Sequence, residues 1–219
     1  MKLIACAAGL LATSALYARA GDQASPPKVL IIGDSISIGY TKPLADILAD
    51  KATVVHNPGN AQHSAYGLAN LDKWLGSTQW DVIHFNHGLH DLKYVDEQGK
   101  NTSSKQTGHI QIPVQQYEKN MAAIVARLKK TGAKLIFATT TPYPDRPAGP
   151  LREAGQAEKY NQAALRVMAK HNIPVNDLHA FALPRLKQLQ KPRNVHFKPE
   201  GSRALAQEVA SHILKALGE

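Results

Sequence analysis

The sequence predicts a three-layer α/β/α sandwich around a central, mostly parallel, five-stranded sheet. Short apolar runs of strand length alternate along the 219 residues with segments of helical periodicity. Such alternation is typical of parallel sheets whose strands are connected by helices. Neither an internal repeat nor a low-complexity tract nor an interdomain linker interrupts the series, so we expect one domain over residues 21–219.

Five apolar runs have the length of buried strands, and they lie at residues 28–32, 52–55, 81–85, 133–138 and 173–175. Helical periodicity marks the segments 40–48, 64–75, 114–130, 153–171 and 199–217. The third helix places its large apolar residues on one stripe, formed by Met121, Ile124, Val125 and Leu128. Gly132 ends that helix, and Pro199 with Glu200 begins the last one with favourable first-turn chemistry.

The first twenty residues are typical of an export signal. Lys2 precedes an apolar stretch at residues 3–16, and Ala18-Arg19-Ala20 forms a small-x-small cleavage site. A membrane anchor is the competing interpretation, but the stretch is shorter than the ~20 residues that span a bilayer. We therefore expect a signal peptide at 1–20, no stable membrane insertion after its cleavage, and a secreted or periplasmic protein. The single cysteine, Cys6, lies inside the signal, which excludes disulfides and thiolate metal sites from the mature chain.

The basic charge favours an anionic partner. The formal net charge is +9, and loss of Lys2 and Arg19 with the signal lowers it by two. Nucleic acid is not expected, because lysines and arginines are scattered at helical spacing without interleaved aromatic residues. An acidic polysaccharide or the cell envelope fits an exported basic protein better.

Two places in the chain offer the parts of a serine nucleophile and its base. Gly33-Asp34-Ser35-Ile36-Ser37 directly follows the first strand, and Asn194-Val195-His196 precedes the last helix. A strand that ends in Gly-Asp-Ser puts the hydroxyl at the carboxyl edge of the sheet, where open α/β sheets bind ligands. The backbone N–H of Ser35 could also contribute to an oxyanion hole at the helix start. Ser37 is expected to cap or line that helix instead.

Two long loops also follow strands, at residues 91–113 and 139–151. The first is polar, and the second carries four prolines. Loops at this edge commonly bind substrate, although both could be surface insertions without a role. Tyr143, in the proline-rich loop, is the candidate for a sugar contact.

In four places the sequence resembles the SGNH, or GDSL, hydrolases, a family with a flavodoxin-like α/β/α fold. Gly33 to Ser37 matches the nucleophile block, Asn57-Pro58-Gly59-Asn60 the second block, Gly88-Leu89-His90-Asp91 the third, and Arg193 to His196 the last. The resemblance covers nearly all of the mature chain. It implies that Ser35 and His196 are catalytic, that Gly59 supplies a backbone oxyanion donor, and that no cofactor is needed.

The third and last blocks each depart from the family pattern. The third block normally carries an Asn oxyanion donor where this chain has His90, so either the imidazole of His90 or the amide of Asn86 would take that role. The last block normally has Asp where this chain has Arg193, which accepts no hydrogen bond. A backbone carbonyl, or a carboxylate such as Asp177 or Glu200, would then orient His196. Otherwise the chain would be a catalytically dead member.

A small set of residues is expected to contact substrate. It comprises Asp34, Tyr143 and Arg193, the last within a basic rim that Lys191 and Lys198 share; the alternative is that the rim only aids solubility. A zinc site at His84, His87 and His90 is not expected, because residues 84 and 87 of a strand point to opposite faces.

We therefore expect an exported serine esterase that removes acyl groups, acetyl above all, from a carbohydrate. Its partner would be a small-molecule or polysaccharide ester, including an anionic one. The alternatives are a non-catalytic glycan-binding protein of the same fold and a hydrolase of another ester, such as a lipid or a sulfate.

Overall fold

A five-stranded parallel sheet forms the middle layer of the structure, a computed structural model that describes residues 25–219. Its strands are β1 (Lys28–Ile32), β2 (Thr53–His56), β3 (Val82–Phe85), β6 (Lys134–Ala138) and β7 (Val175–Asn176), in the order β2-β1-β3-β6-β7. In this register Leu30 of β1 lies between Val55 of β2 and Ile83 of β3. All four strand pairs are parallel, which confirms the predicted sheet.

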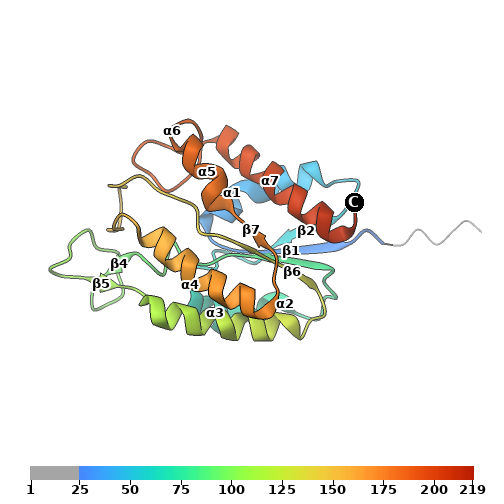
Figure 1. Ribbon diagram of the computed structural model, residues 1–219, viewed down its shortest axis with the longest axis horizontal. Helices are drawn as coiled ribbons and strands as arrows, with labels where there is room; N and C mark the ends of the chain where they lie inside the picture. Colours follow the sequence, from blue (N-terminus) through green and yellow to red (C-terminus); the bar gives the residue numbers. More distant parts are fainter. Residues whose placement is uncertain (1–24) are drawn as a thin grey trace, which may run out of the picture.

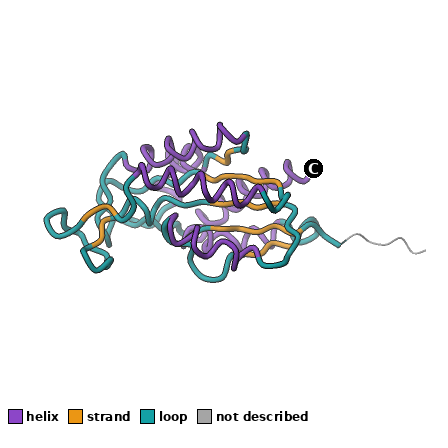
Figure 2. The backbone as a smooth tube through the Cα atoms, turned by 90° about the horizontal axis from the view of Figure 1, so that it is seen from below, coloured by secondary structure: helices purple, strands orange, loops and turns teal. Residues whose placement is uncertain are grey.

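Helices cover both faces of this sheet (Figures 1 and 2). One face carries α1 (Ser35–Ile47), α5 (Leu178–Ala182), α6 (Leu186–Leu189) and α7 (Pro199–Leu217), with the 3-10 turn η1 (Leu183–Arg185) between α5 and α6. The other face carries α2 (Ser64–Leu75), α3 (Val114–Lys129) and α4 (Gln156–His171). The predicted α/β/α sandwich is confirmed.

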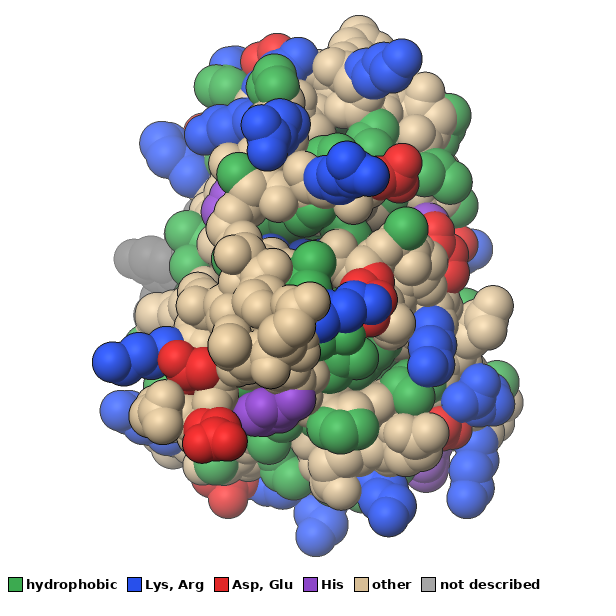
Figure 3. Space-filling model, turned by 90° about the vertical axis from the view of Figure 1, so that its left-hand side faces the viewer, with side chains coloured by type: hydrophobic (Ala, Val, Ile, Leu, Met, Phe, Trp, Pro, Cys, Tyr) green, Lys and Arg blue, Asp and Glu red, His purple; other side chains and the backbone are tan. Residues whose placement is uncertain are grey.

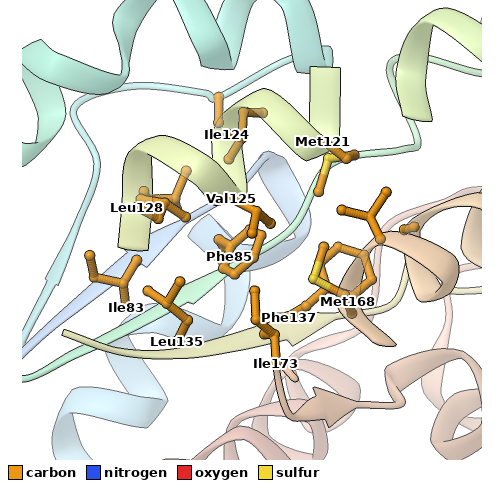
Figure 4. Packing of buried hydrophobic residues seen from close by; sticks show 14 of the residues in the cluster. Ile83, Phe85, Met121, Ile124, Val125, Leu128, Leu135, Phe137, Met168 and Ile173 are labelled. Atoms are coloured by element: carbon orange, nitrogen blue, oxygen red, sulfur yellow. The ribbon is translucent and has the colours of Figure 1, made fainter. Parts of the chain in front are cut away.

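The core consists of two hydrophobic clusters, one on each face of the sheet. Alternate strand residues feed them: Ile83 and Phe85 of β3 pack toward α3, whereas Val82 packs with residues of α1 and α7. Figure 4 shows the first cluster, where Met121, Val125 and other residues of the predicted α3 stripe meet the sheet. Burial on both faces explains why β1 and β6 are continuously apolar after their first residue rather than alternating.

The strand order places a crevice at the carboxyl ends of β1 and β3. From β1 the chain crosses to β2 on one side, and from β3 it continues through β6 and β7 on the other. Ligands of open α/β sheets bind where the winding direction changes in this way. The Gly-Asp-Ser turn follows β1 and the Gly-Leu-His-Asp segment follows β3, so the fold brings two of the sequence blocks to this crevice.

Several helices and strands begin or end at other residues than predicted, and some short elements were not predicted from the sequence. Helix α1 begins at Ser35 rather than at residue 40, because the Asp34 carboxylate accepts a hydrogen bond from the Ile36 N–H (2.9 Å) and caps the helix there. The loop at 91–113 contains a small antiparallel sheet of β4 (Tyr94–Val95) and β5 (His109–Ile110). The short helices α5 and α6 were also not predicted.

The two long loops are tied together rather than independent. The Tyr94 N–H donates to the Leu151 carbonyl (3.0 Å), and the Leu151 N–H donates to the Thr102 carbonyl (2.8 Å). The segment at 139–151 is therefore held against the β4–β5 hairpin at the carboxyl edge of the sheet.

None of the helices within residues 25–219 is long and apolar enough to cross a membrane. The predicted signal peptide, with Cys6, lies outside the described residues.

Candidate active site

The turn after β1 places Ser35 at the first position of α1, with its side chain only partly buried. The Gly33 N–H donates to Asn57 Oδ1 (2.9 Å), which joins the first sequence block to the second. A Cβ on Gly33 would lie 2.6 Å from the Ser37 hydroxyl, closer than real contacts allow. Only glycine fits this turn, so its place in the motif has a steric reason.

The hydroxyl of Ser35 meets the imidazole of His196. Ser35 Oγ and His196 Nε2 are 2.9 Å apart, although 161 residues separate them in sequence. His196 lies in the segment just before α7, and α7 packs against α1, which begins at Ser35. The predicted nucleophile and base are thus brought within hydrogen-bond distance.

Asn194 orients this imidazole, a role that the sequence analysis did not assign to it. Asn194 Oδ1 lies 3.0 Å from the His196 N–H and 2.7 Å from His196 Nδ1. Because a backbone N–H can only donate, the Asn194 atom in this contact is the oxygen, and Nδ1 must therefore carry the ring proton. This tautomer leaves Nε2 as an acceptor for the Ser35 hydroxyl.

The expected orienting groups are elsewhere, which corrects the prediction. Asp177 caps α5 and accepts a hydrogen bond from the Thr139 hydroxyl (2.8 Å). Glu200 is exposed in the first turn of α7, and no backbone carbonyl is bonded to His196 Nδ1 among the described residues. A neutral side-chain amide two residues before the histidine takes the place of the family's aspartate three residues before it.

The surroundings of His196 hold it in the neutral form that a base requires. Partial burial lowers its pKa below the ordinary 6.5, and the charges of Lys191 and Arg152 lower it further. The Asp34 carboxylate acts in the opposite direction. At neutral pH the imidazole is therefore free to accept a proton.

Two backbone N–H groups near Ser35 are free to bind an oxyanion. Neither the Ser35 N–H nor the Gly59 N–H has an acceptor within residues 25–219. Asn57 Nδ2 donates to the Gly59 carbonyl (3.1 Å), and Gly59 has a φ of +70°, in the left-handed region that favours glycine. The second block therefore sets the conformation of one candidate donor.

His90 has the tautomer of an N–H donor at Nε2. Lys93 Nζ lies 3.4 Å from His90 Nδ1, and because an ammonium can only donate, Nδ1 is the acceptor of this contact. Burial, together with the charges of Lys93 and Arg152, lowers the pKa of His90 to about 3. The imidazole is thus neutral, with its remaining proton on Nε2.

The side-chain amide of Asn86 already forms a hydrogen bond with another strand. Its Nδ2 donates to the Ala138 carbonyl (2.8 Å) and links the carboxyl ends of β3 and β6. Of the two side chains predicted for the third oxyanion donor, only His90 has a ring N–H without an acceptor among the described residues, so it remains the candidate.

The residues predicted to contact substrate have different surroundings in the structure. Asp34 is buried and its carboxylate caps α1, so the structure gives it a role at the helix start in place of the predicted substrate contact. The hydroxyl of Tyr143 donates to the Glu153 carbonyl (2.8 Å), and its half-buried ring packs against both hydrophobic clusters. Arg193 is exposed with a φ of +52°, and Lys198 donates to carbonyls of α6; within residues 25–219 neither forms a hydrogen bond with Ser35 or His196.

Ser37 forms a second serine–histidine contact that is structural. Its hydroxyl lies 2.7 Å from His56 Nε2 and 2.8 Å from the Asp34 carbonyl, but the residue is only 3% exposed. A buried hydroxyl with two partners lines the helix, as the sequence analysis expected.

His84 in β3 and His87 just after it have separate partners. His84 Nε2 contacts Asn176 Oδ1 (3.1 Å), and His87 Nδ1 contacts the Gln62 carbonyl (3.2 Å). Within the described part of the chain, no group of three or more His, Cys, Asp or Glu side chains is arranged to hold a metal ion.

Two further residues of this region, Lys93 and Arg152, were missed: Lys93 lies in a segment interpreted only as a loop, and Arg152 lies between the predicted proline-rich loop and the next predicted helix. Both are buried, at 9% and 6% exposed. A long cationic side chain in a polar loop carries no sequence signal of burial, whereas Asn194 could have been found from the tendency of Asn to bond to the N–H two residues on. Figure 3 faces this edge of the molecule, where Lys and Arg side chains gather above a recess on the side of α6.

A serine hydroxyl paired with an oriented, neutral imidazole at the carboxyl edge of a parallel sheet defines a serine-dependent ester hydrolase. The family comparison agrees, because residues 31–204 match the model of the GDSL-like lipase/acylhydrolase family. The chain belongs to this family, and the resemblance noted in the sequence is confirmed.

Solved structures with the same fold include several hydrolases. An acetyl xylan esterase, AlAXEase, has a TM-score of 0.68 at 19% identity, over 85% of this chain and 99% of its own. A lipase/acylhydrolase from Enterococcus faecalis has a TM-score of 0.67 at 21% identity, over 85% and 95%. The psychrotrophic esterase EstA from Pseudoalteromonas sp. has a TM-score of 0.66 at 16% identity, over 88% and 99%. No curated protein matches the sequence significantly.

Proposed function

We propose that this protein is an exported esterase that removes acyl groups, acetyl above all, from a carbohydrate. The observation that carries the proposal is the Ser35–His196 contact, with His196 Nδ1 bonded to Asn194. Export is proposed from the residues of the signal sequence alone.

In the proposed mechanism Ser35 Oγ attacks the ester carbonyl carbon while its proton passes to His196 Nε2. The carbonyl oxygen becomes an oxyanion, held by the N–H groups of Ser35 and Gly59 and by His90 Nε2–H. His196 then returns the proton to the departing sugar oxygen, and the C–O bond breaks. A water molecule attacks the acyl-enzyme, again through His196, and releases the acid and free Ser35.

The carbohydrate substrate is supported by the polar edge around Ser35. The loop at 91–113 is a polar hairpin rather than an apolar lid of the kind that would favour a lipase. One solved structure of the same fold is an acetyl xylan esterase, and this likeness supports a sugar ester as the substrate.

Hydrolysis of 4-nitrophenyl acetate and of acetylated xylo-oligosaccharides tests this function. We expect Ser35→Ala and His196→Ala to abolish turnover of both, whereas Ser37→Ala, at a buried serine two residues away, should keep it. His90→Ala should lower kcat by about 10²- to 10³-fold, the usual cost of one oxyanion donor, and His90→Asn should restore most of it.

Each contrary result identifies an alternative. A wild-type protein that binds the oligosaccharide but hydrolyses no ester would be the glycan-binding protein, and a rate that rises with acyl chain length would indicate a lipase. Turnover of sulfated but not acetylated sugars would move the chemistry to sulfate esters.

A further inference from the structure

Two buried cations flank His90, on the loops that follow β3 and β6. Arg152 is 6% exposed, and its Nε donates to the Leu89 carbonyl (3.1 Å), next to His90 in the chain. Lys93 is 9% exposed and contacts His90 Nδ1. Leu89 itself packs in one cluster with Ile36 and Val195, which adjoin Ser35 and His196 in the chain. Both cations therefore contact the Leu89–His90 segment, which belongs to the third sequence block.

Neither cation forms an ion pair within residues 25–219, although the Asp34 carboxylate lies within electrostatic reach of Arg152 and the Asp91 carboxylate within reach of Lys93. No ion pair of the described chain includes Arg152 or Lys93. The two terminal nitrogens of Arg152 also have no acceptor there. Of the two buried carboxylates nearby, Asp91 accepts two hydrogen bonds from Ser64 on one oxygen, and Asp34 caps α1. A buried cation that lacks a hydrogen-bonded ion pair is costly, so a site that keeps two such cations can accommodate a bound anion.

The charges interact with each other and with the Ser35–His196 pair. Burial lowers the pKa of Lys93 and the charge of Arg152 lowers it further, whereas the Asp91 carboxylate raises it. Arg152 also lowers the pKa of both His196 and His90, which places its guanidinium within electrostatic reach of both imidazoles. A negative group bound here would relieve the repulsion between the cations while lying beside the reacting ester.

We propose that Arg152, together with Lys93, binds a carboxylate carried by the ester substrate. The inference rests on the proposed esterase function and narrows its substrate class to anionic esters. A guanidinium with two free terminal nitrogens can hold a carboxylate through two parallel hydrogen bonds, a geometry that lysine or a neutral amide does not reproduce. The carboxylate could belong to the alcohol side, as in a uronic acid, or to the acyl side, as in a dicarboxylic half-ester.

Matched ester pairs separate these two sources. The alcohol-side pair is acetylated galacturonic acid against acetylated galactose, and the acyl-side pair is 4-nitrophenyl hydrogen adipate against 4-nitrophenyl hexanoate. We expect the wild type to prefer the charged member of one pair. In Arg152→Gln the ratio of kcat/KM for charged over neutral ester should fall by about 10- to 100-fold, as expected for loss of a charge-assisted bidentate contact. Arg152→Lys should recover only part of it.

The control is Arg127→Gln, an exposed arginine of α3 that pairs with Asp72 and should leave the ratio unchanged. Equal losses for charged and neutral esters in Arg152→Gln would overturn the proposal, because they would mean that Arg152 serves the oxyanion or the fold. A wild type without preference in either pair would overturn it as well.

A binding measurement covers the cases in which Arg152→Gln does not fold or no ester is turned over. Galacturonate should raise the melting temperature of the wild type and galactose should not, and the shift should weaken at high salt. Absence of any uronate or adipate shift would contradict the proposal even in an active esterase. A protein that shows the shift but hydrolyses no ester would refute the esterase function and leave the anion site standing.

Discussion

At the scale of single residues, Asn194 decides how the base works. A family aspartate would hold the ring proton of His196 and stabilise the imidazolium by its charge, whereas the Asn194 amide does only the first. The site therefore relies on hydrogen-bond geometry rather than on a buried ion pair. The pKa of His196 lies below its ordinary value, in line with that arrangement.

Substitutions of Asn194 should distinguish the effect of orienting the His196 ring from the effect of a negative charge beside it. Asn194→Ala should lower kcat/KM by about 10- to 100-fold, because the ring can then rotate or adopt the other tautomer. Asn194→Asp keeps both acceptor contacts and adds a charge that raises the pKa of His196. Since the base acts when neutral, kcat/KM falls as pH drops through this pKa, so the acid limb of the profile should move to higher pH in Asn194→Asp.

Asn70→Asp on α2 controls for the added charge alone and should leave the pH profile unchanged. An acid limb that stays in place in Asn194→Asp would contradict the role given to the Asn194 contact.

At the scale of elements, the start of α7 sets the position of His196. The Lys198 N–H donates to the Leu189 carbonyl at the end of α6 (2.9 Å), and Gln190 and Phe197 form an isolated bridge on either side of the loop. Gly201, in the first turn of α7, packs directly on this carbonyl, where a Cβ would overlap the Leu189 backbone. The loop that carries Asn194 and His196 is thus anchored by a close helix contact.

Gly201→Ala should therefore lower both stability and activity, although Gly201 does not belong to the Ser35–His196 pair. We expect a cost of about 1 to 3 kcal/mol from overpacking, or roughly 2 to 10 °C in melting temperature, with reduced kcat because the His196 loop must shift. Gly39→Ala is the matched helical control, since its Cβ would meet only the movable Ser202 hydroxyl at 3.3 Å. Similar melting temperatures and activities for the two variants would show that this contact does not position the loop.

At the scale of the whole molecule, buried titratable groups couple stability to pH in opposite directions. Burial lowers the pKa of His84 and of His87 to about 4. Burial is also the main reason that the pKa of His90 is lowered to about 3. Burial raises the pKa of Asp91 to about 7. Between pH 4 and 6.5 unfolding therefore takes up protons on the three histidines, which lowers stability as pH falls. Asp91 releases a proton on unfolding in the same range, which lowers stability as pH rises.

Proton uptake on unfolding measures this balance. Near pH 5 we expect net uptake in the wild type, and Asp91→Asn should increase it by about one proton because the opposing release is lost. Calorimetric unfolding in two buffers of different ionisation enthalpy counts the protons. The melting temperature of Asp91→Asn relative to the wild type should also rise between pH 5 and pH 8. An unchanged proton count would mean that Asp91 is ionised in the folded protein at pH 5.

The sequence by itself determined the α/β/α class, the segments that become strands and long helices, and the identities of Ser35 and His196. These follow from local rules, namely apolar runs, helical periodicity and a motif with its own turn chemistry. The start of α1 and the short helices α5 and α6 were missed, because a cap or a tertiary contact outweighs propensity there.

The tertiary structure alone decided which groups support the pair. Asn194 took the role expected of a backbone carbonyl or a carboxylate, because an Asx turn and the packing of α7 point its oxygen at both N–H groups of His196. Arg152 and Lys93 became buried because two loops, which the sequence presents as separate polar segments, are hydrogen-bonded to one another over the sheet edge. Burial and orientation depend on contacts between residues far apart in the chain, so periodicity and motif spacing carry no record of them.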